Sequence, residues 1–186
     1  RWIQLRMKDA CESEIERIAL RLIPECRRRG AIFIIDDHVE LAIKTGADGV
    51  HLGKNDMSVA DARRLAGPDF IIGGTANTFE DIQRIAREGA DYIGCGPFRF
   101  TTTKKNLAPV LGADGYENII SQMRKTGISL PLVAIGGITI GDIPDLMQTG
   151  VSGIALSGSI LRSDHPIEEM KNVIRRLNNK TTGECL

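Results

Sequence analysis

The chain has 186 residues, of which 42% are hydrophobic and 26% charged, and its 24 basic and 24 acidic residues give a formal net charge of zero. This length suits one domain with a substantial core, and the balanced charge disfavours a general nucleic-acid binder, which usually carries a basic excess. No apolar run approaches the ~18 residues of a membrane-spanning helix, and the amino-terminal residues lack the apolar core of a signal peptide.

Seven short apolar segments, rich in β-branched residues, predict strands. They are Trp2–Leu5, Ala31–Ile35, Gly49–Leu52, Phe70–Gly73, Tyr92–Gly94, Leu132–Ile135 and Gly153–Leu156. Their apolar residues run continuously rather than alternating with polar ones, which is typical of buried parallel strands.

Helical segments follow these strands, and most of them end next to a glycine. Two begin at a hydroxyl residue with an acid three positions later, Ser58 with Asp61 and Thr78 with Asp81, which resembles a capping box. The predicted helices run from about Glu12 to Arg29, Val39 to Thr45, Ser58 to Gly67, Thr78 to Gly89, Tyr116 to Thr126, Asp142 to Thr149 and Pro166 to Asn178.

This alternation of strands and helices predicts an α/β fold with a parallel sheet and right-handed crossovers. Seven units are one fewer than a closed (β/α)8 TIM barrel contains, so a barrel would place its first strand and helix before Arg1. An open doubly wound sheet is the competing fold, but the chain has no G-x-G-x-x-G loop. We expect a single domain over residues 1–180 and a frayed tail over 181–186.

The four cysteines, Cys11, Cys26, Cys95 and Cys185, form no C-x-x-C pair. A zinc site or a thioredoxin-type motif is therefore disfavoured, and we expect four ordinary thiols in a cytoplasmic protein. Cys95 lies in an apolar strand and is most simply a small core residue.

Polar side chains and glycines collect after the predicted strands, where the active residues of a parallel barrel lie. In chain order they are Gln4, Arg6 and Lys8; Asp36, Asp37 and His38; His51, Lys54 and Asp56; Thr75; Thr101, Thr102, Thr103 and Lys104; Gly136 and Gly137; and Ser157, Gly158 and Ser159. Fixed cations, carboxylates, hydroxyls and backbone N–H groups together predict a phosphate or diphosphate site with a hard divalent cation.

Each of these groups also has a purely structural interpretation. The segment from Gln4 to Lys8 fits a solvated strand edge, and Asp36–Asp37 fit a helix cap. His51, inside an apolar strand, is more readily a hydrogen-bonded core residue than a ligand. The segment 101–103 fits an ordinary turn, although the following Lys104 and Lys105 favour an anion clamp. The functional interpretation rests on all seven strands contributing at the same end.

Several segments occur in the same order as in one known family, and the Q-L-R-x-K and T-x-T-K segments together are the specific part. The segments are Gln4-Leu5-Arg6-Met7-Lys8, Ile35-Asp36-Asp37, Gly49-Val50-His51-Leu52-Gly53-Lys54-Asn55-Asp56, Gly94-Cys95-Gly96-Pro97, Thr101-Thr102-Thr103-Lys104 and Ala134-Ile135-Gly136-Gly137-Ile138. From Gln4 to about Leu161 the chain resembles the thiamine phosphate synthases, which are (β/α)8 barrels. These enzymes join hydroxymethylpyrimidine diphosphate to a thiazole phosphate and release pyrophosphate.

The resemblance implies a role for each matching position. Pyrimidine diphosphate would be bound by Gln4, Arg6, Lys8, Asp36, Thr75 and Lys104, and thiazole phosphate by Thr101, Thr102, Thr103, Gly137, Ser157 and Gly158. Asp37 and Asp56 would bind Mg²⁺. Arg6, Lys8 and Lys104 would be catalytic because they neutralise the leaving pyrophosphate, so that positioning and electrostatics accelerate the reaction without a protein nucleophile.

Three features depart from the family pattern. Asp36 stands where Asn is common, Ser157-Gly158 replaces an apolar-Ser pair, and the first strand–helix unit does not occur in this sequence. Thr75 stands where Ser is usual, which keeps the hydroxyl and adds a methyl group. An extra carboxylate at Asp36 would either tighten the metal site or repel diphosphate.

Two other functions stay open. The sister thiazole tautomerases share the barrel and His51 but lack the combined Q-L-R-x-K and T-x-T-K segments, and a catalytically inactive phosphate-binding barrel would also fit. We expect small phosphate and diphosphate substrates and no nucleic-acid or membrane partner, and a homo-oligomer stays open.

Overall fold

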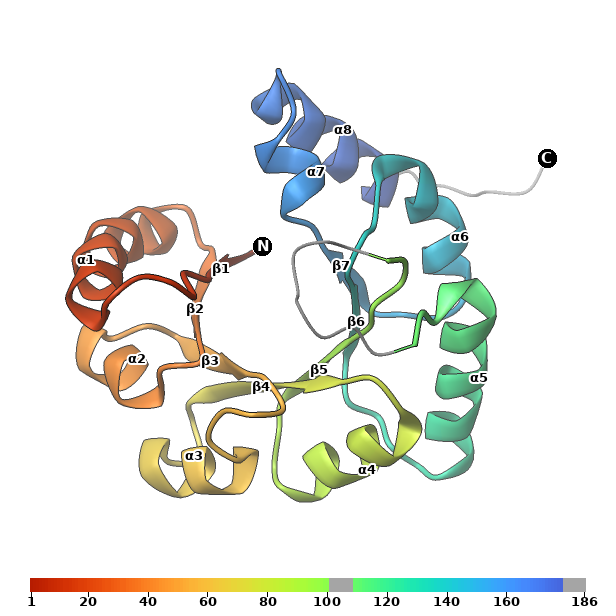
Figure 1. Ribbon diagram of the computed structural model, residues 1–186, viewed down its shortest axis with the longest axis horizontal. Coiled ribbons are helices and arrows are strands. Elements are labelled where there is room, and N and C mark those ends of the chain that lie inside the picture. Colours follow the sequence, from red (N-terminus) through yellow and green to blue (C-terminus); the bar gives the residue numbers. More distant parts are fainter. Residues whose placement is uncertain (101–108, 179–186) are drawn as a thin grey trace. The chain divides into compact units, whose positions relative to one another are not determined.

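The computed structural model describes residues 1–100 and 109–178. The chain forms two compact units, one of Arg1–Ala76 with Glu80–Ile93 and the other of Asn77–Phe79 with the chain from Gly94 onward. The seven predicted strands are all present, and their order in the sheet is their order in the sequence (Figure 1).

The first unit consists of strands and helices in strict alternation. Its elements are β1 (Trp2–Leu5), α1 (Glu12–Arg28), β2 (Ile32–Asp36), α2 (Val39–Thr45), β3 (Gly49–Leu52), α3 (Val59–Ala66), β4 (Ile71–Ala76), α4 (Phe79–Arg87) and the start of β5 (Tyr92–Cys95). Strands β1 to β4 pair in parallel, with Leu5 opposite Ile35 and Asp36 opposite His51. The carboxyl ends of these strands therefore share one edge of the sheet.

Burial and capping explain the local structure of this unit. Phe33, Ile34 and Ile35 are all at most 1% exposed, because helices cover one face of β2 and other side chains cover the opposite face. Ser58 caps α3 by accepting a hydrogen bond from the backbone N–H of Asp61 at 3.1 Å, as the sequence predicts. Gly46 ends α2 in the left-handed conformation.

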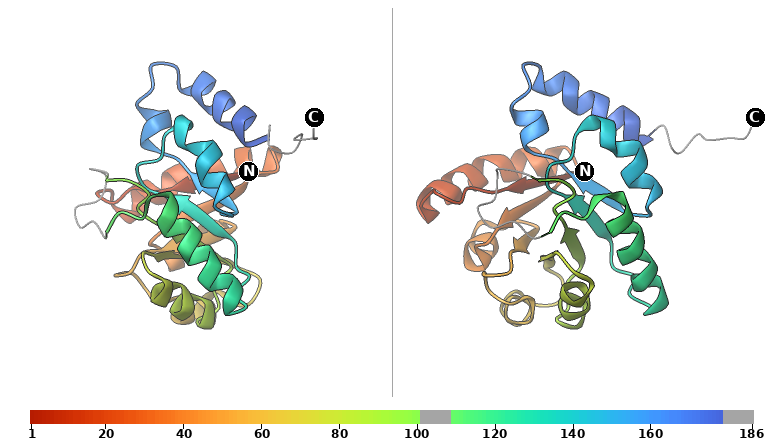
Figure 2. Two further views of the ribbon diagram at one scale, coloured as in Figure 1. Left: turned by 90° about the vertical axis from the view of Figure 1, so that its right-hand side faces the viewer. Right: turned by 45° about the vertical axis from the view of Figure 1, so that its right-hand side comes forward.

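The second unit continues from β5 with α5 (Gly112–Lys125), β6 (Leu132–Ile135), the 3-10 helix η1 (Ile140–Asp142), α6 (Ile143–Gln148), β7 (Gly153–Ala155), α7 (Gly158–Leu161) and α8 (Pro166–Asn178). β6 and β7 pair in parallel, with Ile135 opposite Ala155. Helix α8 packs against α6 and α7 (Figure 2). The buried Tyr116 of α5 donates a hydrogen bond to the carbonyl of Cys95 at 2.6 Å, which ties this helix to β5.

Several predicted boundaries are wrong. Strand β2 extends to Asp36 and β4 to Ala76, so Asp36 and Thr75 lie within strands rather than after them. Helix α5 begins at Gly112 instead of Tyr116, and the short helix α7 was not predicted. Glycine disfavours helices, so the predicted start of this helix lay after Gly112 and Gly115.

The structure also bears on the expectations for the cysteines and for membrane-spanning helices. Cys11, Cys26 and Cys95 are free thiols, and Cys95 is fully buried as predicted, whereas Cys185 and the tail 181–186 lie outside the described residues. Among residues 1–100 and 109–178, no helix has the length and apolar character required to cross a membrane.

Candidate functional site

Asp36 contacts two side chains of the segment from Gln4 to Lys8, which is called the basic segment below. Its carboxylate is 7% exposed and accepts a hydrogen bond from the Gln4 side-chain amide at 2.5 Å. The same carboxylate lies 3.7 Å from the Arg6 guanidinium. Neighbouring parallel strands thus bring Gln4, Arg6 and Asp36 together, as predicted, and Asp36 contacts the two basic-segment side chains directly.

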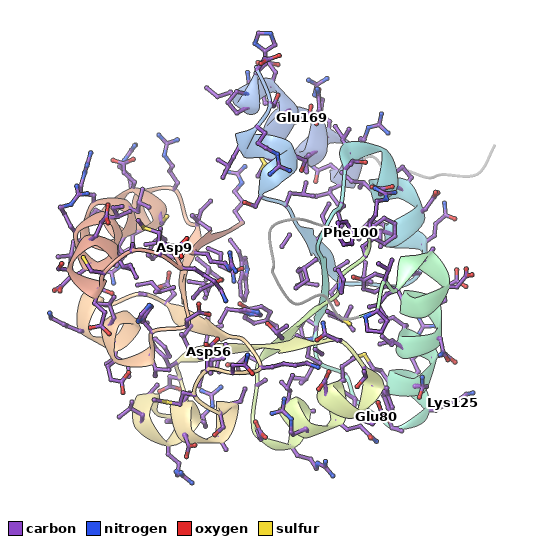
Figure 3. All side chains as sticks on the ribbon, viewed as in Figure 1. Asp9, Asp56, Glu80, Phe100, Lys125 and Glu169 are labelled. Carbon is purple, nitrogen blue, oxygen red and sulfur yellow. The ribbon has the colours of Figure 1, made fainter. Side chains whose placement is uncertain are left out.

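Asp37 and Asp56 meet at the same edge of the first unit. Asp56 lies in the loop between β3 and α3 (Figure 3), where its carboxylate accepts a hydrogen bond from the Gly53 N–H at 2.6 Å and is close enough to Asp37 to affect the pKa of that residue. Burial raises the pKa of Asp37, and the neighbouring Asp56 carboxyl raises it further, while Lys8 and Arg6 act in the opposite direction. Asp37 also has a φ of 71°, a left-handed conformation that is uncommon outside glycine and often marks functional sites.

This carboxylate pair fits a magnesium ion. Mg²⁺ typically takes one or two carboxylates and completes its shell with substrate phosphate and water. Two adjacent acids whose charges repel each other, with Lys8 and Arg6 close enough to act on Asp37, provide such a partial shell. No group of three or more His, Cys, Asp or Glu side chains suited to a metal occurs in the described part of the chain. Two carboxylates would leave the rest of a magnesium ion's coordination shell to phosphate and water.

A second polar group is buried between β3, β4 and β5. The two ring nitrogens of His51 lie 3.0 Å from the Tyr92 hydroxyl and 3.0 Å from the Thr75 hydroxyl. His51 is 7% exposed, so the interpretation of a hydrogen-bonded buried histidine is confirmed. Thr75, predicted to touch substrate, is fixed by this network. Burial raises the pKa of Tyr92, and the nearby Asp36 raises it further, so Tyr92 stays protonated.

Glycine 73 makes room for this network. A Cβ atom built on Gly73 would lie 2.1 Å from the Tyr92 ring, so the ring rests directly on the strand backbone. Tyr92 is not among the predicted site residues, because it lies in a strand of otherwise apolar residues. Its hydroxyl, which requires a partner when buried, was the available signal.

A cavity of about 90 Å³ opens beside Asp56 and Thr75, and Arg84 also lines it. The lining includes Lys54, but that side chain pairs with Asp81 at 2.6 Å. The Lys54 side chain is thus held by Asp81, and Asp56 supplies a carboxylate to the lining of this cavity.

In the second unit, Gly136 and Gly137 follow β6 and contact the loop after β5. A Cβ atom on Gly137 would lie 2.8 Å from the Arg99 carbonyl oxygen, and both glycines have positive φ. Phe100 is the last described residue of that loop before residue 109 (Figure 3). The predicted residues Thr101, Thr102, Thr103 and Lys104 lie outside the described residues.

Ser157 and Gly158 follow β7 and lead into α7. Because Ile135 lies opposite Ala155, Gly137 and Ser157 leave the sheet at the same level of neighbouring strands. A Cβ atom on Gly158 would lie 2.3 Å from the Arg162 guanidinium, so this cation lies against the Gly158 backbone. The predicted residues Gly137, Ser157 and Gly158 therefore lie at one edge of the second unit, and Arg162, which is not among the predicted site residues, lies beside Gly158.

The fold and these residues define an α/β protein with a parallel sheet and clustered acidic and basic side chains at its carboxyl edge. A family model described as thiamine monophosphate synthase matches residues 1–160. Thiamine-phosphate synthase of Phocaeicola vulgatus is 63% identical over 174 residues, which cover 94% of this chain and 84% of that protein. The Bacteroides fragilis enzyme of the same name is 60% identical, with 94% and 85% covered.

A solved structure, thiamine phosphate pyrophosphorylase from Pyrococcus furiosus, matches with a TM-score of 0.85 and 31% identity. The match covers 96% of this chain and 83% of the solved chain. The chain belongs to the thiamine monophosphate synthase family. Its function is that of a thiamine-phosphate synthase, a transferase of thiamine biosynthesis, as the family resemblance implied.

Proposed function

We propose that this chain joins hydroxymethylpyrimidine diphosphate to a thiazole phosphate, yielding thiamine phosphate and pyrophosphate. The observation that carries the proposal is the meeting of Asp37 and Asp56 beside the basic side chains Arg6 and Lys8. Paired acids next to fixed cations suit a diphosphate that arrives with a divalent metal.

The residues of the first unit would bind the diphosphate substrate. Gln4 and Arg6 are oriented by Asp36, and Thr75 by His51. Asp37 and Asp56 would hold Mg²⁺, which supplies positive charge to the phosphate oxygens when bound. Arg6 and Lys8, together with Lys104, would stabilise the negative charge that grows on the departing pyrophosphate.

The bond changes require no protein nucleophile. The bond between the pyrimidine methylene carbon and the diphosphate oxygen breaks, and the electron pair leaves with pyrophosphate. The thiazole nitrogen donates the electron pair of the new carbon–nitrogen bond. Side chains on this chain would bind and orient the two substrates, and such positioning accounts for much of the rate enhancement in reactions of this kind.

The thiazole phosphate is assigned to Thr101, Thr102 and Thr103 and to the backbone near Gly137, Ser157 and Gly158. Glycine residues let a backbone approach a phosphate closely, and in parallel barrels the loops after the last strands commonly bind phosphate. The sequential order of the seven parallel strands and the match to a solved thiamine phosphate pyrophosphorylase support the further proposal that these strands belong to a (β/α)8 barrel.

The test is an assay of the purified chain with both substrates and Mg²⁺, with thiamine phosphate and pyrophosphate quantified together. We expect equimolar products, and none when either substrate is omitted. Product formation undiminished after exhaustive metal chelation would refute the magnesium assignment. Absence of thiamine phosphate at all substrate and Mg²⁺ concentrations would refute the proposed reaction.

A pair of neighbouring variants tests the partition of the two substrates. Thr103→Val should raise the KM for thiazole phosphate more than that for pyrimidine diphosphate. Lys104→Ala should do the opposite and also lower kcat, because charge on the leaving group grows in the transition state. Equal effects of both variants on both substrates would show that the partition is wrong.

A further inference from the structure

The half-exposed Arg99 side chain donates hydrogen bonds to acceptors on two different residues. Its two terminal nitrogens donate to the two carboxylate oxygens of Asp142 at 2.8 and 2.9 Å. One of these nitrogens also donates to the carbonyl of Gly137 at 3.2 Å, and the backbone N–H of Arg99 donates to the carbonyl of Gly136 at 3.0 Å. Arg99 thus holds both carbonyls of the glycine pair.

Asp142 is itself fixed, so the pair is rigid on both sides. It accepts hydrogen bonds from the backbone N–H and the hydroxyl of Thr139, each at 2.8 Å, at the start of η1. The hydrogen bond from Arg99 and these local donors lower the pKa of Asp142 to about 2, although its partial burial opposes the shift. A forked guanidinium–carboxylate pair of this geometry orients both side chains as well as attracting them.

The orientation of the two carbonyls determines where the neighbouring N–H groups point. A trans peptide unit is planar, and its N–H points opposite to its C=O. Because the Gly136 carbonyl bonds to the Arg99 backbone, the N–H of Gly137 points away from that atom. Because the Gly137 carbonyl bonds to the Arg99 guanidinium, the N–H of Ile138 likewise points away from Arg99. Two successive donors are thereby directed by one residue.

The tight approach at Gly137 shows how closely this arrangement is packed. With a φ of 72° and only 2.8 Å between an added Cβ and the Arg99 carbonyl, position 137 excludes any side chain in this conformation. A shift of Arg99 would therefore be transmitted to the glycine backbone.

We propose that Arg99 and Asp142 form a positioning pair that fixes the Gly137 and Ile138 N–H groups for the phosphate of the thiazole substrate. This role rests on the proposed function, which assigns that phosphate to the Gly137 backbone. Arg99 acts through Gly137 and does not itself touch the substrate.

The experiment compares Arg99→Gln, Arg99→Lys and wild type in steady-state assays in which each substrate is varied separately. We expect Arg99→Gln to raise the KM for thiazole phosphate by about tenfold, less than the hundredfold that a 1 Å misplacement can cost. The KM for pyrimidine diphosphate should stay within twofold. Arg99→Lys should recover only part of the loss, because an ammonium group cannot replace the planar fork.

The matched control is Lys171→Gln. It removes another ion pair of the same unit, that between Lys171 and Glu168 at 2.7 Å on α8, and both KM values should be unchanged. Equal increases in both KM values for Arg99→Gln, or an unchanged KM for thiazole phosphate, would overturn the positioning role.

Titration calorimetry with thiazole phosphate alone separates this inference from the proposed reaction. A wild-type chain that binds thiazole phosphate but forms no thiamine phosphate would refute the reaction, while about tenfold weaker binding by Arg99→Gln would still support the positioning pair. Equal Kd values for the two chains, or no binding by wild type, would refute the pair.

Discussion

Removal of the Asp36 carboxylate should weaken the use of pyrimidine diphosphate without unfolding the chain. Asp36 is buried and holds Gln4 through a 2.5 Å hydrogen bond, with Arg6 at 3.7 Å. In Asp36→Ala, both side chains lose the acceptor that orients them. A hydrogen bond to a charged group contributes about 1.5–3 kcal/mol, and the exposure of Gln4 places this bond at the lower end.

A loss of ~1.4 kcal/mol in transition-state binding corresponds to a tenfold fall in kcat/KM. We therefore expect Asp36→Ala to lower kcat/KM for pyrimidine diphosphate about tenfold, with the KM for thiazole phosphate unchanged. Asp36→Asn keeps an oxygen acceptor for the Gln4 amide and loses only the charge near Arg6. Its kcat/KM should fall no more than about threefold, because an ion pair at 3.7 Å to a partly exposed arginine is weak.

The assay is continuous detection of released pyrophosphate, with thermal unfolding of each variant as the control for folding. If Asp36→Ala matches wild type for both substrates, Asp36 does not orient Gln4 for binding. If Asp36→Asn is as impaired as Asp36→Ala, the charge rather than the hydrogen bond is what matters, and the reasoning from the 2.5 Å contact fails.

Three further outcomes are expected. Asp56→Ala should lower kcat more than a hundredfold and abolish the response of activity to Mg²⁺, with an unchanged circular dichroism spectrum; wild-type turnover would contradict the metal assignment. Burial and Asp56 raise the pKa of Asp37, so without Mg²⁺ the stability of the wild type should fall as pH rises through that raised pKa; in Asp37→Asn, urea unfolding should show a smaller fall and a higher stability at neutral pH. Tyr116→Phe removes the 2.6 Å hydrogen bond to Cys95 and should lower Tm by roughly 4 °C in calorimetry, and an unchanged Tm would show that the bond contributes little.

Local patterns predicted the elements well but not their ends. The strands β1, β3 and β6 have the predicted bounds, because their apolar runs stop where the sheet stops. Asp36 and Thr75 were placed after strands because they are polar. Pairing with neighbouring strands instead keeps both residues within strands. Asp36 lies opposite His51 in the sheet, and β4 continues past Thr75. Hydrogen bonds to a neighbouring strand extend a strand beyond its apolar residues. Such pairing cannot be inferred from the sequence of that strand alone.

The residues of the candidate site were likewise predicted only in part. Residues whose chemistry is visible in their type, such as the acids Asp37 and Asp56, were predicted, and these two lie close enough for Asp56 to raise the pKa of Asp37. Tyr92 and Arg99 were missed because their importance lies in distant partners. Tyr92 meets His51, 41 positions earlier, and Arg99 meets Asp142, 43 positions later. Such separations are set by the fold, so these two roles emerge only from the folded chain.

The seat of Tyr92 on Gly73 links two positions that are 19 apart in the sequence. An added methyl group at position 73 would occupy the space of the aromatic ring, at 2.1 Å from its nearest atom, and the hydroxyl of that ring is held by His51. A larger residue at position 73 therefore requires a smaller residue at position 92. In a library that randomises both codons and is selected for activity, alanine or serine at 73 should be recovered only together with a smaller residue at 92. Any lineage that passes through such a double change must rebuild the hydrogen bond to His51 from another side chain.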